Sequence, residues 1–493
     1  MSGLKVFNTL TSKKEDFVPL KAGKVNLYSC GPTVYDLSHL GHARKEINFD
    51  VIQRYLRFSG YDLTYVRNIT DIDDKIINRA REIDERTEKL ARRFTFTFWK
   101  DMDALNVAPP DMEPRATEYI KPMMTFVEEL IKKGHAYVSE GDVYFDVLSF
   151  KSYGKLRKQS IEDLLHGARD QVRSQSELKE IKKNPVDFAL WKSAPQSEMG
   201  WESPWGWGRP GWHLECSTMI KHALGVTIDI HGGGEDLIFP HHENEIAQSE
   251  ALHDGESLAK YWLHNSFVQV DAEKMSKSLG NFQTIQSVLA NYSPDTVRLF
   301  VLQTHYRSPI EFSADSVEAA KAGTARLLRA ARFAKDDDAH SSVRNNGKAH
   351  KYLTSNHPCL QSLRDDGEAG DVIRKLHADF VESMDNDFNT PQAISALFAV
   401  ADLIFSSKDE NLAAKYAAGL KAYAGVLGLT LTDTGKMIDS DTGAQLVERL
   451  LDLRDAARAN KDYKQSDQIR DTLQALGIKV MDVKGGRAQW EKE

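Results

Sequence analysis

The sequence predicts an α/β protein in which a Rossmann-like, parallel-sheet catalytic domain is split by an insertion and followed by an all-α C-terminal region. Strand–helix–strand patterns occur at 25–70 and again at 226–270, which is typical of the two halves of an open parallel sheet. The residues between them have mixed patterns and contain a stretch rich in Trp, Pro and Gly at 191–212. After residue 290 apolar residues recur at helical intervals, which predicts helices.

The first pattern predicts a strand, a helix and a second strand. VNLYSC at 25–30 is β-rich and stops at Gly31-Pro32. Apolar side chains then recur with helical spacing over 41–58, and LTYVRNIT at 63–70 is again β-rich. HLGH (39–42) therefore lies between the predicted strand and the start of the predicted helix. In a parallel sheet this position is the usual anion-binding site.

The second pattern predicts the other half of the sheet. VTIDI (226–230) predicts a strand, the glycines at 232–234 a tight turn, and HHENEIAQSEALH (241–253) a helix with Pro240 near its start. NSFVQV (265–270) predicts another strand, followed by a loop that carries KMSKS. Farther along, a helix is expected over 391–405 and two more over 446–476.

Composition limits the class of protein. With 493 residues the chain is long enough for several domains, and its net charge of −8 argues against a nonspecific basic coat for nucleic acid. Three cysteines do not suit a disulfide framework, which favours a reducing compartment. Neither a signal peptide nor an apolar run of about 18 residues is evident. We expect a cytoplasmic monomer with no membrane association.

Two short motifs could bind a polyphosphate. In HLGH, Gly41 would let a ligand approach the backbone, and His39 and His42 could donate hydrogen bonds to phosphate oxygens. In KMSKS, Lys274 and Lys277 lie on a Ser-containing loop after a predicted strand. Each motif alone is weak evidence, because surface lysines and isolated histidines are common. Together, on the two halves of the sheet, they are the paired signature of class I aminoacyl-tRNA synthetases.

A soft-metal site is the second expectation. Cys30, Cys216, His241 and Glu245 form a donor set that suits Zn²⁺, and His241 and Glu245 are spaced to share one helix face. His242 and Glu243 are expected to point away from that face. The alternative is that both cysteines are small buried hydrophobic side chains, the commonest fate of a free cysteine.

The order and spacing of the motifs resemble those of cysteinyl-tRNA synthetases over nearly the whole chain. The matching segments are CGPTVYD…HLGHAR, NITDIDDKI (68–76), GRPGWHLECS (208–217), HGGGEDLIFPHHENEIAQSEA (231–251), EKMSKSLGN (273–281), THYRSPIEFS (304–313), MDNDFNTPQA (384–393) and KDYKQSDQIRDTLQALGIKV (461–480).

The resemblance implies a two-step reaction: L-cysteine and ATP, with Mg²⁺, give cysteinyl-adenylate, and the acyl group passes to the 3′ end of tRNA(Cys). It places one Zn²⁺ on the four donors above, where the ion would distinguish a thiol from the hydroxyl of serine. It also assigns the other site residues. The implied phosphate-gripping residues are His39, His42, Lys274 and Lys277; the nucleotide contacts are Gly41, Gly233, Asp236 and Lys277; and the cysteine pocket is lined by Thr70, Trp212 and His231. DIDDK (71–75) is expected to cap a helix rather than to bind metal.

The expected domains follow from the same comparison. They are 1–110 (first half of the catalytic domain), 111–205 (inserted connective domain), 206–290 (second half, with zinc ligands and KMSKS), 291–335 (stem-contact region), 350–430 (helical bundle) and 431–493 (anticodon-binding region). Two alternatives stay open: a cysteine ligase of thiol-cofactor synthesis with an amino-sugar acceptor, and a non-catalytic tRNA-binding paralogue. Residues 449–493 carry 10 Lys/Arg against 8 Asp/Glu and include Arg470, Arg487 and Trp490, which favours tRNA.

Overall fold

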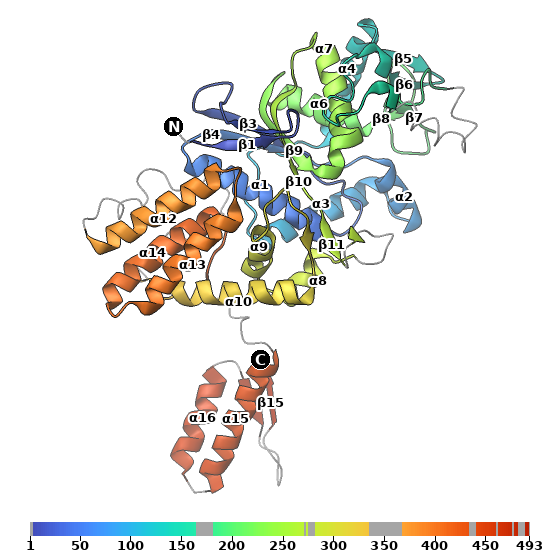
Figure 1. Ribbon diagram of the computed structural model, residues 1–493. Helices are drawn as coiled ribbons and strands as arrows, with labels where there is room; N and C mark the ends of the chain where they lie inside the picture. Colours follow the sequence, from blue (N-terminus) through green and yellow to red (C-terminus); the bar gives the residue numbers. More distant parts are fainter. Residues whose placement is uncertain are drawn as a thin grey trace. The chain divides into compact units, whose positions relative to one another are not determined.

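The computed structural model describes residues 3–163, 181–270, 273–274, 282–334, 367–432, 440–459, 462–475, 478–481 and 489–492. The chain divides into two compact units, Met1–Leu431 and Thr432–Glu493. Figure 1 shows the elements of both. The first unit contains the four-stranded parallel sheet.

A four-stranded parallel sheet forms the centre of the first unit, in the order β10-β9-β3-β4. Its strands are β3 (Lys24–Ser29), β4 (Asp62–Arg67), β9 (Ile228–Gly234) and β10 (Ala259–Asn265). Neighbours from the two halves of the sequence pair directly, with Leu27 opposite Ile230. The α/β class and the split parallel sheet predicted from the sequence are therefore confirmed.

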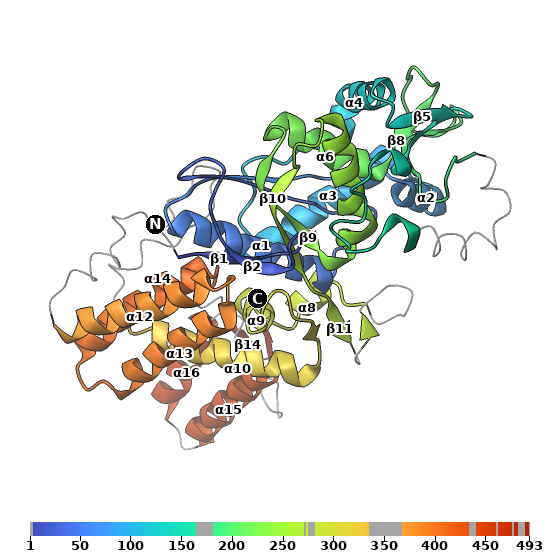
Figure 2. The ribbon, with the colours of Figure 1, turned by 45° about the horizontal axis from the view of Figure 1, so that its top comes forward.

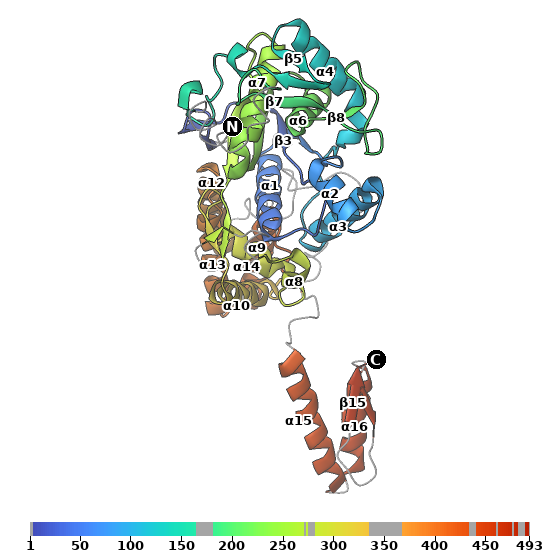
Figure 3. The same ribbon diagram turned by 90° about the vertical axis from the view of Figure 1, so that its right-hand side faces the viewer.

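Helices cover both faces of this sheet (Figure 3). On one face α1 (Leu40–Phe58) packs in a core that includes Val25 and Leu27 of β3. On the other face α6 (Trp212–Ala223) and α7 (Glu243–Leu252) pack in a core that includes Tyr28 and Cys30. Because side chains alternate along a strand, the step from Leu27 to Tyr28 moves the contact to the opposite face.

The predicted tight turn at 232–234 is wrong, since these glycines are the last residues of β9. A Cβ on Gly232 would lie 2.4 Å from Phe49 Cζ in α1 and 2.7 Å from the carbonyl oxygen of Leu263 in β10. Glycine is needed here because a helix and a neighbouring strand approach the backbone closely, and not because the chain reverses.

The residues between the two half-sheets begin with α2 (Asp74–Glu82) and α3 (Thr87–Ala104) and continue to α4 (Ile120–Lys132). An antiparallel sheet follows, in the order β5-β6-β7-β8, with strands at Ala136–Ser139, Asp142–Phe145, Phe188–Ser193 and Gly208–Pro210. The DIDDK expectation holds, because Asp73 caps α2 by accepting a hydrogen bond from the Lys75 N–H.

The rest of the first unit is mainly helical (Figure 2). Its helices are α8 (Ile285–Leu289), α9 (Pro294–Leu302), α10 (Ala314–Ala331), α12 (Glu368–Asp385), α13 (Thr390–Ser406) and α14 (Glu410–Val426). Short strands complete it: β1 (Lys5–Asn8) pairs with β2 (Lys13–Asp16), and β11 (Val268–Val270) lies between β12 (Glu273–Lys274) and β13 (Ile310–Glu311).

The second unit contains α15 (Ser440–Ala459) and α16 (Tyr463–Ala475), which fulfil the expectation of two helices. It also contains a hairpin of β14 (Ile478–Met481) and β15 (Gln489–Lys492), so the C-terminal region is mainly helical but the expectation that it is all-α is wrong. Trp490 pairs with Val480 in this hairpin. Arg487 lies outside the described residues.

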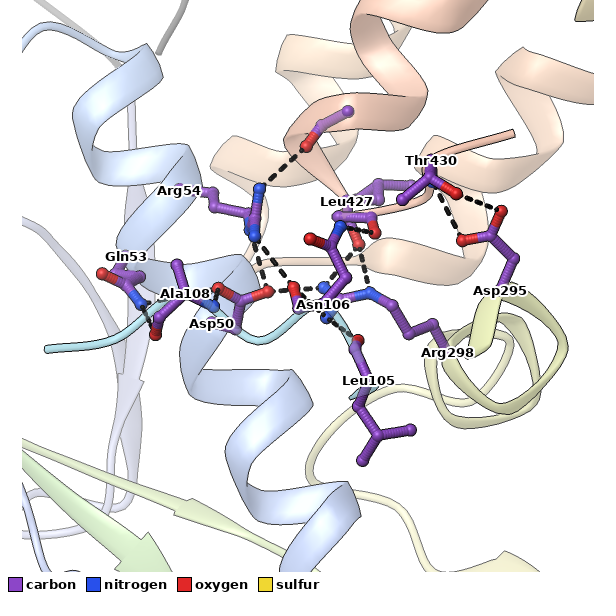
Figure 4. Close-up of polar contacts among 12 residues, drawn as sticks. Asp50, Gln53, Arg54, Leu105, Asn106, Ala108, Asp295, Arg298, Leu427 and Thr430 are labelled. Carbon is purple, nitrogen blue, oxygen red and sulfur yellow. Dashed lines mark hydrogen bonds and ion pairs between the residues drawn. The ribbon is translucent and has the colours of Figure 1, made fainter. Parts of the chain in front are cut away.

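A buried ionic network ties α1 to the helical region (Figure 4). The Asp50 carboxylate of α1 accepts hydrogen bonds from Arg54 at 2.8 Å and from Arg298 of α9 at 2.6 Å. Arg298 also donates to the carbonyl oxygen of Leu427, just after α14, and Arg54 and Arg298 both donate to the carbonyl oxygen of Asn106. The network therefore joins four segments of the chain: α1, the residues after α3, α9 and the end of α14.

Glu46 of α1 makes a second buried ion-pair cluster, with Lys45 and Arg67. Burial alone would raise the pKa of Glu46, but the two cations outweigh it and the pKa is lowered. A lowered folded pKa gives stability that is present above the unfolded value of about 4.3 and lost as the pH falls through the folded value. Glu46→Gln should therefore lower the free energy of unfolding at pH 7 by roughly 3 kcal/mol.

Urea unfolding of the wild type and the Glu46→Gln variant between pH 3 and pH 8 measures this effect. The two midpoints should converge in acid, where the wild-type carboxyl is also neutral. A difference that stays constant with pH would contradict the assignment.

Candidate metal and nucleotide site

The site residues gather where the strands of the parallel sheet end. Cys30 directly follows β3, Thr70 follows β4, and His231 and Gly233 lie near the carboxyl end of β9. Because all four strands are parallel, these carboxyl ends share one edge of the sheet, where open α/β folds bind ligands.

Cys30, Cys216, His241 and Glu245 are brought together at this edge, and all four side chains are buried. One donor atom from each lies within 4.8 Å of the others. The two Sγ atoms are 3.6 Å apart, Cys30 Sγ is 3.4 Å from Glu245 Oε1, and His241 Nε2 is 2.8 Å from the same carboxylate oxygen. Two sulfurs, an imidazole and a carboxylate at these separations can surround one ion.

The donors fit a zinc ion for two further reasons. His241 Nε2 is buried and lies 2.8 Å from Glu245 Oε1, but no well-aligned hydrogen bond joins the two atoms. A buried polar atom that is poorly satisfied is costly, and an ion among these donors would satisfy it. The second reason is the pKa of the Cys216 thiol. Burial raises this pKa, but the hydrogen bond from Cys30 and the neighbouring His241 lower it to about 6. A thiolate, the form that binds metal, is thus accessible near neutral pH.

The expectation that His242 points away from the cluster is wrong. Its Nε2 atom lies 3.3 Å from Cys30 Sγ. The regular helix α7 begins only at Glu243, and the preceding turn, Ile238–His242, contains an extended residue, Phe239, with φ −140° and ψ 134°. The irregular backbone brings both His241 and His242 toward the sheet, and Cys30, His231, His242 and Glu245 form a second group of donors that meets the same 4.8 Å limit.

Glu243, by contrast, is directed away, as the sequence predicts. Its carboxylate accepts hydrogen bonds from the backbone N–H groups of Gly154, Leu156 and Arg157. It therefore anchors the inserted region to α7.

The three residues expected to line the cysteine pocket surround the cluster. The Trp212 ring stacks on His241 with centroids 4.1 Å apart. His231 Nε2 lies 2.6 Å from Glu245 Oε2, while its Nδ1 is buried with no hydrogen-bond partner. Thr70 donates to Glu215 Oε2 at 2.9 Å, which joins the end of β4 to the helix that carries Cys216.

HLGH forms the start of α1. His39 is the N-cap residue, and its Nδ1 accepts from the Gly41 N–H at 3.0 Å. His42 Nδ1 in turn accepts from the His39 N–H at 3.2 Å, and the two rings lie 3.9 Å apart. This reciprocal capping box fixes both imidazoles at the positive end of a 19-residue helix, an arrangement that favours phosphate.

The chain that follows KMSKS returns to HLGH. The Leu40 N–H donates to the carbonyl oxygen of Gln283, His39 and Thr284 form a β-bridge, and the Phe282 ring contacts His39. Lys274 belongs to β12, and Lys277 lies outside the described residues. The exit of the predicted KMSKS loop is thus adjacent to the HLGH motif.

The Gly41→Ala variant should lose about 100-fold in ATP–pyrophosphate exchange, since displacement of a positioned group by 1 Å can have that effect. A Cβ at Gly41 would lie 2.7 Å from His39 Cε1 and 2.8 Å from its Nδ1, so the imidazole would have to move. Gly425→Ala in α14 is the matched control, because its Cβ meets nothing within 4 Å. Equal rates in both variants would rule out a role for the His39 position.

The HGGGED segment lies beside the cluster. A Cβ at Gly233 would lie 2.8 Å from Leu237 Cδ1 and 3.3 Å from His242 Cε1, so this glycine leaves room for the histidine. Asp236 follows in a short 3₁₀ turn, Glu235–Leu237, at the carboxyl end of β9. The neighbouring Glu235 accepts a hydrogen bond from Ser266, which connects this turn to the end of β10.

Two histidines near the site were not selected from the sequence. His213 Nδ1 lies 3.0 Å from His241 Nδ1, and His264 Nε2 lies 2.8 Å from His242 Nδ1. No spacing signal identifies them, because His213 lies in the first turn of α6 and His264 lies in β10, far from each other in the sequence. The segment WHLEC (212–216) does place His213 near Cys216 in the sequence.

A parallel sheet with HLGH at the start of its helix, the residues after KMSKS in contact with that motif, and a following helical region defines a class I aminoacyl-tRNA synthetase. Residues 16–322 match the family described as tRNA synthetases class I (C) catalytic domain. Residues 379–432 match the DALR domain, and 444–490 match the cysteinyl-tRNA ligase anticodon binding domain.

Curated relatives name the family. The chain is 47% identical to a cysteine–tRNA ligase of Haemophilus influenzae strain PittGG, over 99% of this chain and 100% of that protein. It is 45% identical to the cysteine–tRNA ligase of Heliobacterium modesticaldum, over 99% of both chains. The chain belongs to the cysteine–tRNA ligase family.

Solved structures agree on the fold. The methionyl-tRNA synthetase of Mycobacterium tuberculosis in complex with methionyl-adenylate has a TM-score of 0.52 at 15% identity, covering 87% of this chain and 94% of that one. The LeuRS–tRNA–LeuAMS complex of Agrobacterium radiobacter K84 has a TM-score of 0.57 at 14% identity, covering 84% and 86%. Among the described residues, no helix has the length and apolar character required to cross a bilayer.

Proposed function

We propose that this cysteine–tRNA ligase selects its amino acid through a zinc ion held by Cys30, Cys216, His241 and Glu245. The observation that carries the proposal is the convergence of these four buried donors, from three separate segments, at the carboxyl edge of the sheet. A bound zinc ion would supply a soft centre that prefers a thiolate to a hydroxyl. A merely shaped pocket rejects a near-isostere by only about 1–3 kcal/mol.

The chain's own residues would hold cysteine around this centre. Trp212, stacked on His241, forms an apolar wall, and the unpartnered Nδ1 of His231 is available to a substrate group. Thr70, held by Glu215, is placed at the end of β4 beside them. In this arrangement the substrate carboxylate can turn toward the HLGH end of the sheet.

Activation requires positioning and charge stabilisation rather than a protein nucleophile. The cysteine carboxylate attacks the α-phosphate of ATP, and pyrophosphate leaves. His39 and His42, fixed by their capping box, with Gly41 between them, would receive the phosphates, joined by Lys274 and Lys277. Gly233 and Asp236 would contact the nucleoside, and Mg²⁺ would accompany ATP.

The acyl group would then pass to the 3′ end of tRNA(Cys). The match of 444–490 to an anticodon-binding domain supports a tRNA acceptor and does not favour the amino-sugar ligase or the non-catalytic paralogue. The six domain boundaries, the monomeric state and the cytoplasmic location expected from the sequence stay predictions.

Cysteine-dependent ATP–pyrophosphate exchange by the zinc-loaded protein tests the first step, with serine as the competing substrate. We expect exchange with cysteine and discrimination against serine well beyond the roughly 200-fold limit of a shaped apolar pocket. Charging of tRNA(Cys), measured against an amino-sugar acceptor, tests the second step. Serine exchange close to the cysteine rate would overturn the proposed role of zinc.

A further inference from the structure

A chain of side chains runs from the metal-binding cluster toward the protein surface and has no part in the reaction as proposed above. Cys30 Sγ lies 3.3 Å from His242 Nε2, His242 Nδ1 lies 2.8 Å from His264 Nε2, and His264 Nδ1 lies 2.8 Å from Thr9 Oγ1. His242 and His264 are buried, and Thr9 is partly exposed. Every ring nitrogen of the two histidines is therefore engaged.

Both imidazoles in this chain of side chains are buried, and their facing nitrogens, His242 Nδ1 and His264 Nε2, lie 2.8 Å apart, so one of these nitrogens must donate and the other accept. A neutral imidazole has one donor and one acceptor nitrogen, so a single choice of tautomer fixes the whole chain. The choice depends on what faces His242 Nε2.

A thiolate at Cys30 decides which atoms donate and which accept in the hydrogen bonds through His242 and His264. When Cys30 binds a metal it is deprotonated and can only accept, so a bare nitrogen at 3.3 Å would set one lone pair against another. A protonated Nε2 instead makes an N–H···S hydrogen bond. His242 Nδ1 must then accept from His264, and His264 Nδ1 must accept from the Thr9 hydroxyl.

Two other histidines contact other members of the donor set. His231 Nε2 lies 2.6 Å from Glu245 Oε2, and His213 Nδ1 lies 3.0 Å from His241 Nδ1. With His242 on Cys30, three of the four donors each have a different histidine behind them. Groups behind metal ligands orient them and tune the ion.

We infer that His242, oriented by His264 and Thr9, is a positioning residue that donates a hydrogen bond to the Cys30 thiolate and so adjusts the affinity of the site for a further thiol. An N–H donor withdraws electron density from the Cys30 sulfur, and the ion is then a stronger acceptor for the substrate sulfur. The inference rests on the zinc site proposed above and extends it to residues that do not bind the ion.

Removal of the donor should weaken the metal site, because the buried Cys30 thiolate loses the N–H that stabilises its charge relative to the protonated thiol. In His242→Leu the zinc affinity, measured by chelator competition, should fall about 10- to 100-fold, as for other changes behind a metal ligand. With Co²⁺ in place of zinc, the thiolate-to-cobalt absorption bands should shift, and the KM for cysteine in pyrophosphate exchange should rise more than kcat falls. His242→Gln, which can still present an N–H to the sulfur, should restore most of the affinity and the spectrum.

Thr9→Val tests the far end of the chain and spares the core. It should shift the cobalt bands in the same direction by a smaller amount. His253→Leu is the matched control: this histidine follows α7, is only partly buried and bonds its own helix at Ser249. It should leave zinc affinity and spectrum unchanged.

Three outcomes would overturn the inference. If His242→Leu and Thr9→Val both keep the wild-type affinity and spectrum, the hydrogen bond to Cys30 has no such role. If His242→Gln loses zinc as completely as His242→Leu, His242 binds the ion itself, as the second donor group would allow. If His242→Leu does not fold, unchanged zinc affinity and cobalt bands in Thr9→Val refute it. Failure of the wild type to bind zinc would instead reject the metal site of the proposed function.

Discussion

Cys216→Ser should abolish cysteine-dependent ATP–pyrophosphate exchange and the binding of zinc. The substitution replaces one of two buried sulfurs, 3.6 Å apart, by a hydroxyl that does not ionise near neutral pH. Changes behind a metal ligand already cost about 10- to 100-fold, so loss of a ligand should exceed that range. Exchange rate and zinc content, measured on the same preparation, check the result.

The third cysteine provides a matched control for this variant. Cys359→Ser makes the same chemical change at a position outside the proposed donor set, and both exchange and zinc content should stay at wild-type values. If Cys216→Ser also retains its zinc and its rate, then Cys216 is only a small buried hydrophobic side chain, the alternative that the sequence leaves open.

The donor set could be predicted because its signals are partly local. Cys30 ends a β-rich run at Gly31-Pro32, and His241 and Glu245 have the spacing of one helix face. Cys216 could be added to the donor set because a thiolate is a preferred ligand of Zn²⁺. The parallel sheet followed from two strand–helix–strand patterns, since crossover connections leave a repeated hydrophobic signature.

What the sequence did not reveal depends on contacts between distant segments. His242 faces Cys30 because the backbone before Glu243 is irregular, and helical spacing does not describe such a turn. His264 contacts His242 and Thr9, and neither its spacing nor its residue type marks it in the sequence. The glycines at 232–234 suggested a reversal because close packing of α1 against β9 is not visible in one segment.

The Asp50→Leu variant should lower the free energy of unfolding of the first unit by about 3–5 kcal/mol, because it leaves a buried cation without its carboxylate. Asp50 and Arg298 are both fully buried and 2.6 Å apart. Arg298 would keep its hydrogen bonds to backbone carbonyls, including Leu427, but dipoles do not neutralise its charge. Urea unfolding, followed by the circular dichroism of the helices, measures the shift in midpoint.

A double variant separates the cost of the unpaired charge from the loss of contacts. Asp50→Leu combined with Arg298→Leu removes the Asp50–Arg298 pair and should recover part of the stability, since apolar side chains can replace a buried pair at little cost; the remainder of the loss belongs to Arg54, which also pairs with Asp50. Lys375→Met is the surface control: its partner, Asp379, is one helical turn away on α12 and both are solvent-exposed, so the midpoint should hardly move. If Asp50→Leu were no more harmful than Lys375→Met, the junction of α1, α9 and the end of α14 would owe its stability to apolar packing and not to the ionic network of Figure 4.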